Sequence, residues 1–374
     1  MKFIVSSTGL YSHLQAVSRV INSKNSLPIL DCVLMEVKEG RITLTASDSE
    51  STLSTSFEVN DSDGEGRFAV SAKKFLDSLK EIPEQPITFD VNTSSMEITI
   101  YYQNGKYSLV GQNAEDFPLA PGLGESAIHV EMETKILLNG INRTLFATAD
   151  DELRPVMNGI YMDMTTADIT FVASDGHRLV REKSSAAQAP AKAAFILPKK
   201  PANILKALVT KSEDKMTIDF DEKNAIIVFN EYKLICRLIE GRYPNYNSVI
   251  PQNNPNKVRI DRQTLTSALR RVSVFSSQAS SLIKLHLDSN LVQISAQDID
   301  FSTSAEEKLN CEYSGNPMSI GFKSTFLIDI LNNLASDEVI IELADPSRAG
   351  VILPSEQEEK DDVLMLLMPM MLND

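Results

Sequence analysis

The chain of 374 residues contains no tryptophan, only three cysteines and only four histidines. The cysteines, Cys32, Cys236 and Cys311, are odd in number and far apart, which excludes a disulfide framework and the paired spacing of a zinc site. A reducing, cytoplasmic environment is therefore expected. The histidines are isolated from one another, and the HExxH and GxSxG motifs are missing. We therefore predict no metal, no cofactor and no catalytic residues of these classes.

A long hydrophobic run is also missing from the sequence. The longest apolar stretch, VLMLLMPMML at 363–372, is about half the length of a membrane span and contains a proline. The first residues, MKFIVSSTGLYS, hold no apolar run of the kind found in signal peptides. The formal net charge of −15 argues against an evenly charged nucleic-acid-binding surface, because DNA would repel it. Any DNA-binding surface must therefore be a local one.

The sequence does contain a repeat at about one third of its length. Three segments begin with a short alternating strand, followed by a leucine and by a second apolar residue four positions later. Their leucines, Leu10, Leu137 and Leu265, are separated by 127 and then 128 residues. A constant spacing of this kind predicts three repeated domains. The predicted domains cover residues 1–122, 127–250 and 256–374.

Each repeat has the pattern of an α+β domain. Segments such as RITLTAS (41–47) and ADITFVAS (167–174) alternate apolar and polar residues, as half-buried strands do. Short turns between them predict antiparallel sheets, and apolar residues at helical spacing predict two helices per repeat on one face of the sheets. The helices are expected at 9–22, 71–81, 134–147, 199–211, 262–275 and 323–333.

The six predicted helices carry fourteen Lys or Arg residues and only three acidic residues, although the chain as a whole is acidic. Glutamate favours helices about as well as lysine, so helix propensity does not explain this difference. No aromatic residues interleave with the cations, which favours contact with phosphates rather than with bases. The candidate DNA-binding residues are Lys24, Lys73, Lys74, Arg143, Lys199, Lys200, Lys206, Lys211, Arg270, Arg271 and Lys323.

Five short motifs lie in a characteristic order along the chain. They are LPIL (27–30), AEDFP (114–118), ASDGHRL (173–179), EGRYPNY (240–246) and MPMML (368–372). With these motifs the chain resembles the bacterial DNA polymerase III beta subunit family, the processivity sliding clamps, from residue 1 to about residue 372. The resemblance implies three clamp domains per chain, each with two helices on antiparallel sheets, and a head-to-tail homodimeric ring around duplex DNA. Twelve helices side by side, each about 10 Å across, would leave an opening of roughly 28 Å, which admits a duplex.

The resemblance also implies a hydrophobic cleft in which short linear motifs dock. The partners of the family are the polymerase catalytic subunit, the clamp loader and repair proteins, and no membrane is involved. The chain departs from the family pattern at Val156, Ser248 and Met371, which affects the preferred peptide. By position, the cleft residues are Arg154, Met157, Ser174, Gly176, His177, Arg178, Leu179, Pro244, Val249, Leu366, Met368, Pro369, Met370 and Leu372.

Closure of a ring needs a contact between the first domain of one chain and the third domain of another. The strand KYSLVG (106–111) resembles the family's boundary strand. The resemblance implies that Tyr107 and Leu109 meet Val274 and Phe275 of the other chain.

Two other functions are compatible with the residues alone. ASDGHRL contains an acid, a glycine, a histidine and an arginine, so a hydrolase that uses the His177 region is one alternative. The other alternative is a scaffold that binds peptides without encircling DNA. The predicted clamp is non-catalytic, which distinguishes it from the first alternative.

Overall fold

The computed structural model describes residues 1–209 and 214–372, and the chain folds into two compact units. The first unit comprises Met1–Lys135 and Lys200–Leu238, and the second comprises Ile136–Lys199 and Ile239–Asp374. The strand pairs of both units are antiparallel throughout the described residues.

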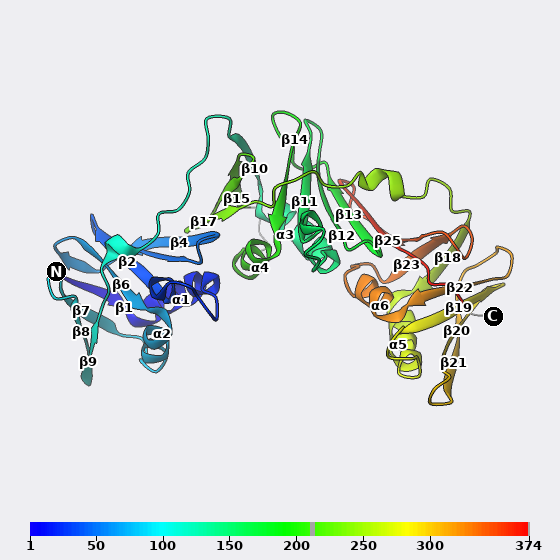
Figure 1. Cartoon of the computed structure of the whole chain (residues 1–374), viewed down its shortest axis with the longest axis horizontal. Helices are drawn as coiled ribbons and strands as arrows, with labels where there is room; N and C mark the ends of the chain where they lie inside the picture. Colours follow the sequence, from blue (N-terminus) through cyan, green and yellow to red (C-terminus); the bar gives the residue numbers. More distant parts are fainter. Residues whose placement is uncertain (210–213, 373–374) are drawn as a thin grey trace. The chain divides into compact units, whose positions relative to one another are not determined.

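The first unit contains two sheets. A five-stranded sheet has the order β5-β1-β7-β8-β9, and an eight-stranded sheet has the order β10-β15-β16-β17-β4-β3-β2-β6 (Figure 1). Their strands are β1 (Lys2–Ser6), β2 (Cys32–Lys38), β3 (Arg41–Ser47), β4 (Ser51–Glu58), β5 (Asp61–Asp63), β6 (Gly66–Ser71), β7 (Pro86–Asn92), β8 (Glu97–Tyr102), β9 (Gly105–Val110), β10 (Ile128–Glu133), β15 (Lys215–Phe220), β16 (Asn224–Phe229) and β17 (Tyr232–Arg237).

Helices α1 (Ser7–Val17) and α2 (Ala72–Lys80) pack against each other in this unit. The Ser6 hydroxyl accepts a hydrogen bond from the backbone N–H of Gly9 at 3.0 Å and caps α1. Helix α1 contacts β1, β3 and β4, while α2 contacts β2 and β6, so the two helices cover strands from both sheets. Helix α4 comprises Lys199–Leu208. Its first residue, Lys199, belongs to the second unit, and its other residues belong to the first.

The second unit also contains two sheets. An eight-stranded sheet has the order β14-β11-β12-β13-β25-β24-β23-β18, and a four-stranded sheet has the order β21-β20-β19-β22. Their strands are β11 (Gly159–Met164), β12 (Ile169–Ser174), β13 (Arg178–Ser184), β14 (Ala193–Pro198), β18 (Asn256–Asp261), β19 (Leu282–Asp288), β20 (Leu291–Asp298), β21 (Thr303–Asn310), β22 (Met318–Lys323), β23 (Glu338–Leu343), β24 (Gly350–Pro354) and β25 (Asp361–Leu367).

Helices α5 (Arg262–Ser273) and α6 (Ser324–Asn332) pack together in the second unit (Figure 1, yellow and orange). The Asp261 carboxylate caps α5 by accepting a hydrogen bond from the Thr264 N–H at 2.6 Å. Helix α3 (Thr134–Thr144) is followed by the short helix η4 (Leu145–Ala147). A single apolar core under α5 and α6 joins residues of β18 to β25.

The predicted architecture of helices packed on antiparallel sheets is confirmed, because the alternating segments form strands and the helical segments form α1 to α6. The predicted candidate Lys211 lies outside the described residues. Both eight-stranded sheets join strands that are far apart in the sequence, since β4 pairs with β17 and β13 pairs with β25. The domain bounds given above stay a prediction.

Candidate functional site

The ASDGHRL motif forms a tight turn between β12 and β13. The Asp175 carboxylate accepts hydrogen bonds from the backbone N–H groups of His177 and Arg178, both at 2.9 Å. The Ser174 hydroxyl donates a hydrogen bond to the Arg178 carbonyl at 2.8 Å and closes the turn. These bonds are typical of an aspartate-initiated turn, and they fix the backbone of the motif.

Gly176 is favoured in this turn by its backbone conformation and by its neighbour Arg154. Its φ of +90° lies in the left-handed region that favours glycine. A Cβ at this position would lie 3.0 Å from Nη1 of Arg154, so the glycine also leaves room for that side chain. The Arg154 guanidinium is held by Asp151, whose carboxylate accepts a hydrogen bond from Arg154 Nε at 2.8 Å. Two predicted cleft residues, Arg154 and Gly176, therefore lie in contact.

Arg178, one of the predicted cleft residues, lies behind the turn and not on an exposed surface. It is only 8% exposed, and it donates hydrogen bonds to Asp175 at 3.0 Å, to Asp329 of α6 at 2.7 Å and to the Phe146 carbonyl at 2.9 Å. Its guanidinium also lies over the rings of Phe146 and Phe326, 5.1 and 4.5 Å from their centroids. The buried charge is thus fully paired, and Arg178 ties the turn to η4 and α6.

An apolar wall lies beside the turn. Leu179 of β13 and Leu366 of β25 are direct partners across the two strands, and both are buried. They belong to a cluster with Tyr243, Tyr246 and Ile250. This wall brings the ASDGHRL motif, the EGRYPNY segment and the end of the chain together.

A hollow of about 560 Å³ opens next to this wall. Val249 and Met368, two predicted cleft residues, line it and are 55% and 42% exposed. The Met368 N–H donates a hydrogen bond to the His177 carbonyl at 2.8 Å, which holds the chain end against the turn. The residues that line the hollow are Ser248, Val249, Ile250, Pro251, Gln252, Asn253, Ser347, Arg348, Ala349 and Met368.

None of the other twelve predicted cleft residues lines the hollow itself. Met157 is buried in the short helix η5 (Pro155–Met157), and Pro244 is exposed. Met370 pairs with Gly321 at the end of the four-stranded sheet, and the half-buried Pro369 connects it to Met368. Leu372 lines a second hollow beside β20 and β21. The end of the chain therefore leaves the hollow after Met368.

Eight of the ten residues that line the hollow are not among the predicted cleft residues, and one of them, Ser248, is named above only as a departure from the family pattern. Ile250 to Asn253 lie in a run that its Pro and Asn content marks as a linker, and that content also fits an exposed rim. Ser347, Arg348 and Ala349 lie between β23 and β24, where the sequence carries no motif. Only the strand pairing of the second unit places them beside Met368.

The predicted DNA-binding residues fall into two groups. Lys24, Lys73, Lys74 and Lys206 are exposed, and no described residue forms an ion pair with them. Lys323 lies 4.6 Å over the Phe326 ring. These five cations remain candidates for contact with phosphate.

The other described cations are already engaged within the chain. Their partners are Asp150 for Lys199, Asp48 for Lys200, Asn332 for Arg270, and Glu307 for Arg271 in a two-bond contact. Lys200 also donates hydrogen bonds to the Val20 carbonyl and to Asn22, so it holds the segment after α1 to α4. An engaged side chain must lose these contacts before it can bind phosphate.

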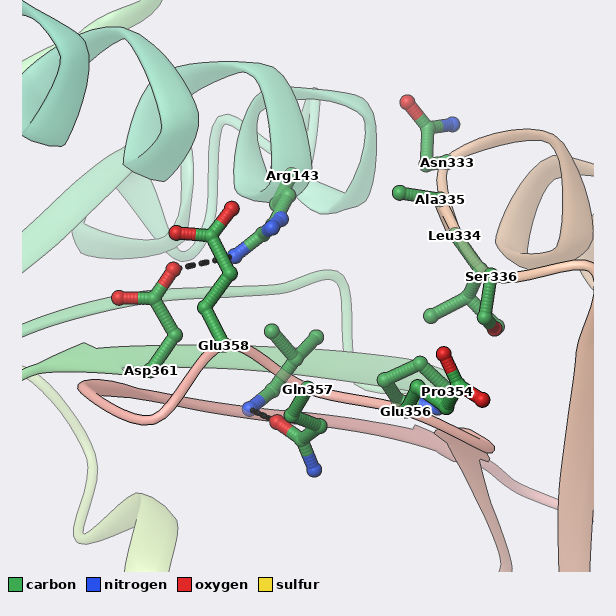
Figure 2. A pocket seen from close by; sticks show the side chains of 11 residues that line it. Arg143, Asn333, Leu334, Ala335, Ser336, Pro354, Glu356, Gln357, Glu358 and Asp361 are labelled. Carbon is green, nitrogen blue, oxygen red and sulfur yellow. Dashed lines mark hydrogen bonds and ion pairs between the residues drawn. The ribbon is translucent and has the colours of Figure 1, made fainter.

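Arg143 is the most strongly engaged of these cations. Its guanidinium lies 2.5 Å from the Glu182 carboxylate and 3.3 Å from that of Asp361. Figure 2 shows Arg143 at the end of α3 beside Asp361 and Glu358, on one side of a pocket of about 320 Å³ that Asn333, Ala335 and Ser336 also line. Glu182 is 1% exposed, and its Oε2 has no hydrogen-bond partner among the described residues. We therefore assign Arg143 to the fold and not to a free cationic surface.

Three domain models of one protein family match nearly the whole chain. The N-terminal domain of the DNA polymerase III beta subunit matches residues 1–121, its central domain matches residues 131–245, and its C-terminal domain matches residues 247–371. The chain belongs to the DNA polymerase III beta subunit family. The family is the non-catalytic sliding clamp subunit of the polymerase, so the predicted function as a DNA sliding clamp is confirmed, as is the predicted clamp fold.

Individual relatives agree with this assignment along their full length. The beta sliding clamp of Vibrio cholerae is 27% identical over 372 residues, and that of Pseudomonas aeruginosa is 28% identical over 374 residues, each covering 100% of both chains. A solved DnaN sliding clamp of Pseudomonas aeruginosa bound to griselimycin superimposes with a TM-score of 0.94 at 27% identity, with 100% of each chain covered.

A hydrolytic function of the His177 region has no support in the geometry. The His177 ring lies 6.0 Å from the Phe326 ring, and no described residue forms a hydrogen bond with its ring nitrogens. Across residues 1–209 and 214–372, no group of three His, Cys, Asp or Glu side chains is arranged to hold a metal ion. None of the described helices is long and apolar enough to cross a membrane.

The predicted contact residues lie near sheet edges of the beta subunit fold. Tyr107 and Leu109 are half-buried on β9, which forms one edge of the five-stranded sheet. Val274 and Phe275 follow α5 and are 78% and 40% exposed. In the second unit, β21 forms an edge of the four-stranded sheet.

The Arg143 cluster predicts a pH-dependent stability. Burial raises the pKa of Glu182 to about 7, although Arg143 opposes this shift, and Asp361 and Asp362 raise the pKa further. A carboxyl whose pKa is higher in the folded state than in the unfolded state stabilises the fold only while it is protonated. The Glu182 contribution should therefore be complete below about pH 4.5 and be lost as the pH rises through 7, by about 3 kcal/mol in total.

The test is urea unfolding of the wild type and of the Glu182→Gln variant between pH 5 and pH 8. The variant cannot ionise at this position, so its stability should fall less over this interval. Equal slopes for the two proteins would contradict the assigned role of Glu182. Asp77→Asn, on the exposed face of α2, is the matched control and should keep the wild-type slope.

Proposed function

We propose that two copies of this chain close head to tail into a ring around duplex DNA, and that partner proteins dock in the hollow. The proposed partners are the polymerase catalytic subunit, the clamp loader and repair proteins, each bound through a short linear motif. The cytoplasm is the proposed location. The single observation that carries the docking function is the hollow itself, where an exposed apolar lining meets the fixed turn at 173–179.

Ring closure is supported by the two sheet edges. An edge strand leaves a row of backbone N–H and C=O groups without partners, and pairing between β9 of one copy and β21 of another would satisfy both rows. Val274 and Phe275 would lose their exposure in the same contact, which favours association. Because the two edges differ, the contact is head to tail, and a closed ring requires matching angles at both ends.

Sequence-independent contact with DNA is supported by the exposed lysines. Lys73, Lys74 and Lys206 lie on helices and are not tied to a carboxylate among the described residues. Flexible lysines attract phosphates through charge and do not read bases, so binding has the same strength at each position along the duplex. Such contacts permit sliding, whereas retention on DNA must then come from encirclement.

The first test is retention on circular DNA. After loading with a clamp loader, the wild type should stay on a nicked circle through gel filtration and should be released when the circle is linearised. Leu109→Asp places a charge in the proposed ring contact and should lower retention, whereas Val228→Asp on the exposed face of β16 should not. Equal retention on circular and linear DNA would contradict encirclement, and a protein that binds peptides but is never retained would favour the scaffold alternative.

The second test is the salt dependence of binding to a linear duplex. The plot of log Kobs against log salt should become shallower by about 0.9 for each phosphate contact that is lost. The triple variant Lys73→Ala, Lys74→Ala, Lys206→Ala should therefore bind more weakly and with a shallower slope. A triple variant at Lys38, Lys192 and Lys233, which are exposed lysines outside the helices, changes the net charge equally. The proposal is wrong if both triple variants change the slope by the same amount.

A further inference from the structure

We propose that Arg348 makes the hollow selective for peptides that carry an acidic side chain next to their apolar anchors. This inference rests on the proposed docking function and adds the chemistry of the partner to it. It is carried by the composition of the hollow and by the way in which Arg348 is held there.

The hollow combines an apolar lining with one charge. Half of its lining residues are apolar, and four are polar but neutral. Arg348 is the one charged side chain among the lining residues that the structure describes, and no acidic side chain lines the hollow with it. An apolar peptide side chain that enters the hollow therefore brings its neighbours close to a single cation.

Arg348 is anchored at one end of its guanidinium only. Its Nε lies 3.2 Å from the Asp345 carboxylate, and its backbone N–H donates a hydrogen bond to the Asp345 carbonyl at 3.3 Å. No described residue accepts a hydrogen bond from its Nη1 or Nη2, and the side chain is 67% exposed. The planar fork of an arginine can bind both oxygens of a carboxylate, and here the outer part of that fork is available.

Asp345 positions Arg348 through Nε and leaves the outer nitrogens of the guanidinium available to a ligand. One Asp345 oxygen accepts hydrogen bonds from the Ser347 N–H at 2.9 Å and from the Ser347 hydroxyl at 2.5 Å, and the other oxygen faces Arg348. The hydrogen bonds from Ser347, together with the charge of Arg348, lower the pKa of Asp345. Asp345 therefore stays ionised and holds the stem of Arg348 in place, so a peptide carboxylate meets an arginine that is already oriented.

A peptide fits this site better than the DNA backbone does. A phosphate would use the guanidinium but would leave Val249 and Met368 exposed to water, whereas a peptide with apolar side chains covers them. The net charge of −15 repels acidic peptides at long range, but that repulsion is screened beyond about 10 Å in 0.1 M salt. The contact with Arg348 acts at hydrogen-bond distance and is screened less.

The test uses fluorescein-labelled nonapeptides with a central Leu-Leu pair, in which one flanking position is Glu, Gln or Lys. Binding to the full-length protein is measured by fluorescence anisotropy. At one of the two positions that flank the Leu-Leu pair, the Glu peptide should bind about five-fold more tightly than the Gln peptide, which is the size expected for a partly exposed ion pair. The Lys peptide should bind most weakly of the three. Arg348→Ala should abolish the difference between Glu and Gln, and Arg348→Glu should reverse the order of Glu and Lys.

Two control variants separate this inference from the docking function. Lys192→Ala removes the same charge from an exposed loop and should keep the preference for Glu. Val249→Asp places a charge in the apolar lining and should weaken every peptide by about ten-fold or more, whatever the flanking residue.

The experiment distinguishes failure of the role of Arg348 from failure of the docking function. If the Leu-Leu peptides bind but Glu and Gln are equal at each flank, or if the preference survives in Arg348→Ala, the role of Arg348 is wrong and docking stands. If no peptide binds the wild type, or if Val249→Asp binds as the wild type does, the docking function itself is wrong, and the inference falls with it.

Discussion

The antiparallel pairing of β13 with β25 is the contact on which the proposed docking hollow depends. Arg178, the first residue of β13, lies opposite Leu367, the last residue of β25. The turn that precedes β13 and the chain end that follows β25 therefore emerge at the same edge, where Met368 donates its hydrogen bond to His177. The hydrogen bonds of the buried Arg178 to Asp329 and to the Phe146 carbonyl then hold this edge on α6 and η4. A rigid edge of this kind lowers the entropic cost of binding a flexible peptide.

The proposed function combines two kinds of recognition that make opposite demands on side chains. Sliding on DNA calls for cations that are free to move, and Lys73, Lys74 and Lys206 meet this condition. Docking calls for side chains that are already in position. This second condition is met by the turn at Gly176, the chain end at Met368 and the anchored Arg348. Cations that are tied to carboxylates, such as Arg143 and Lys200, stabilise the fold instead. The carboxylate partners Glu182 and Asp48 are buried, whereas Asp345, the partner of Arg348, has a side chain that is 43% exposed, and this difference separates structural cations from those that are available to a ligand.

Much of the fold could be predicted because it depends on local periodicity. Alternation with a period of two defined strands such as β3 and β12, and apolar spacing defined the six helices. The ion pairs could not be predicted in this way, because the partners of Lys200 and Arg143 come from distant parts of the sequence and meet only in the folded chain. Arg348 could not be predicted as a site residue for the same reason. It carries no motif, and only the strand order of the second unit brings it beside Val249 and Met368.

The most direct test of this account is the hydrogen exchange of the Met368 amide in the free protein, measured at residue resolution by NMR. The Met368 amide, held by the His177 carbonyl, should exchange much more slowly than that of Met371, a residue that is 80% exposed. Exchange of both amides at the same fast rate would show that the chain end is not held against the turn, and the hollow described here would not exist in solution.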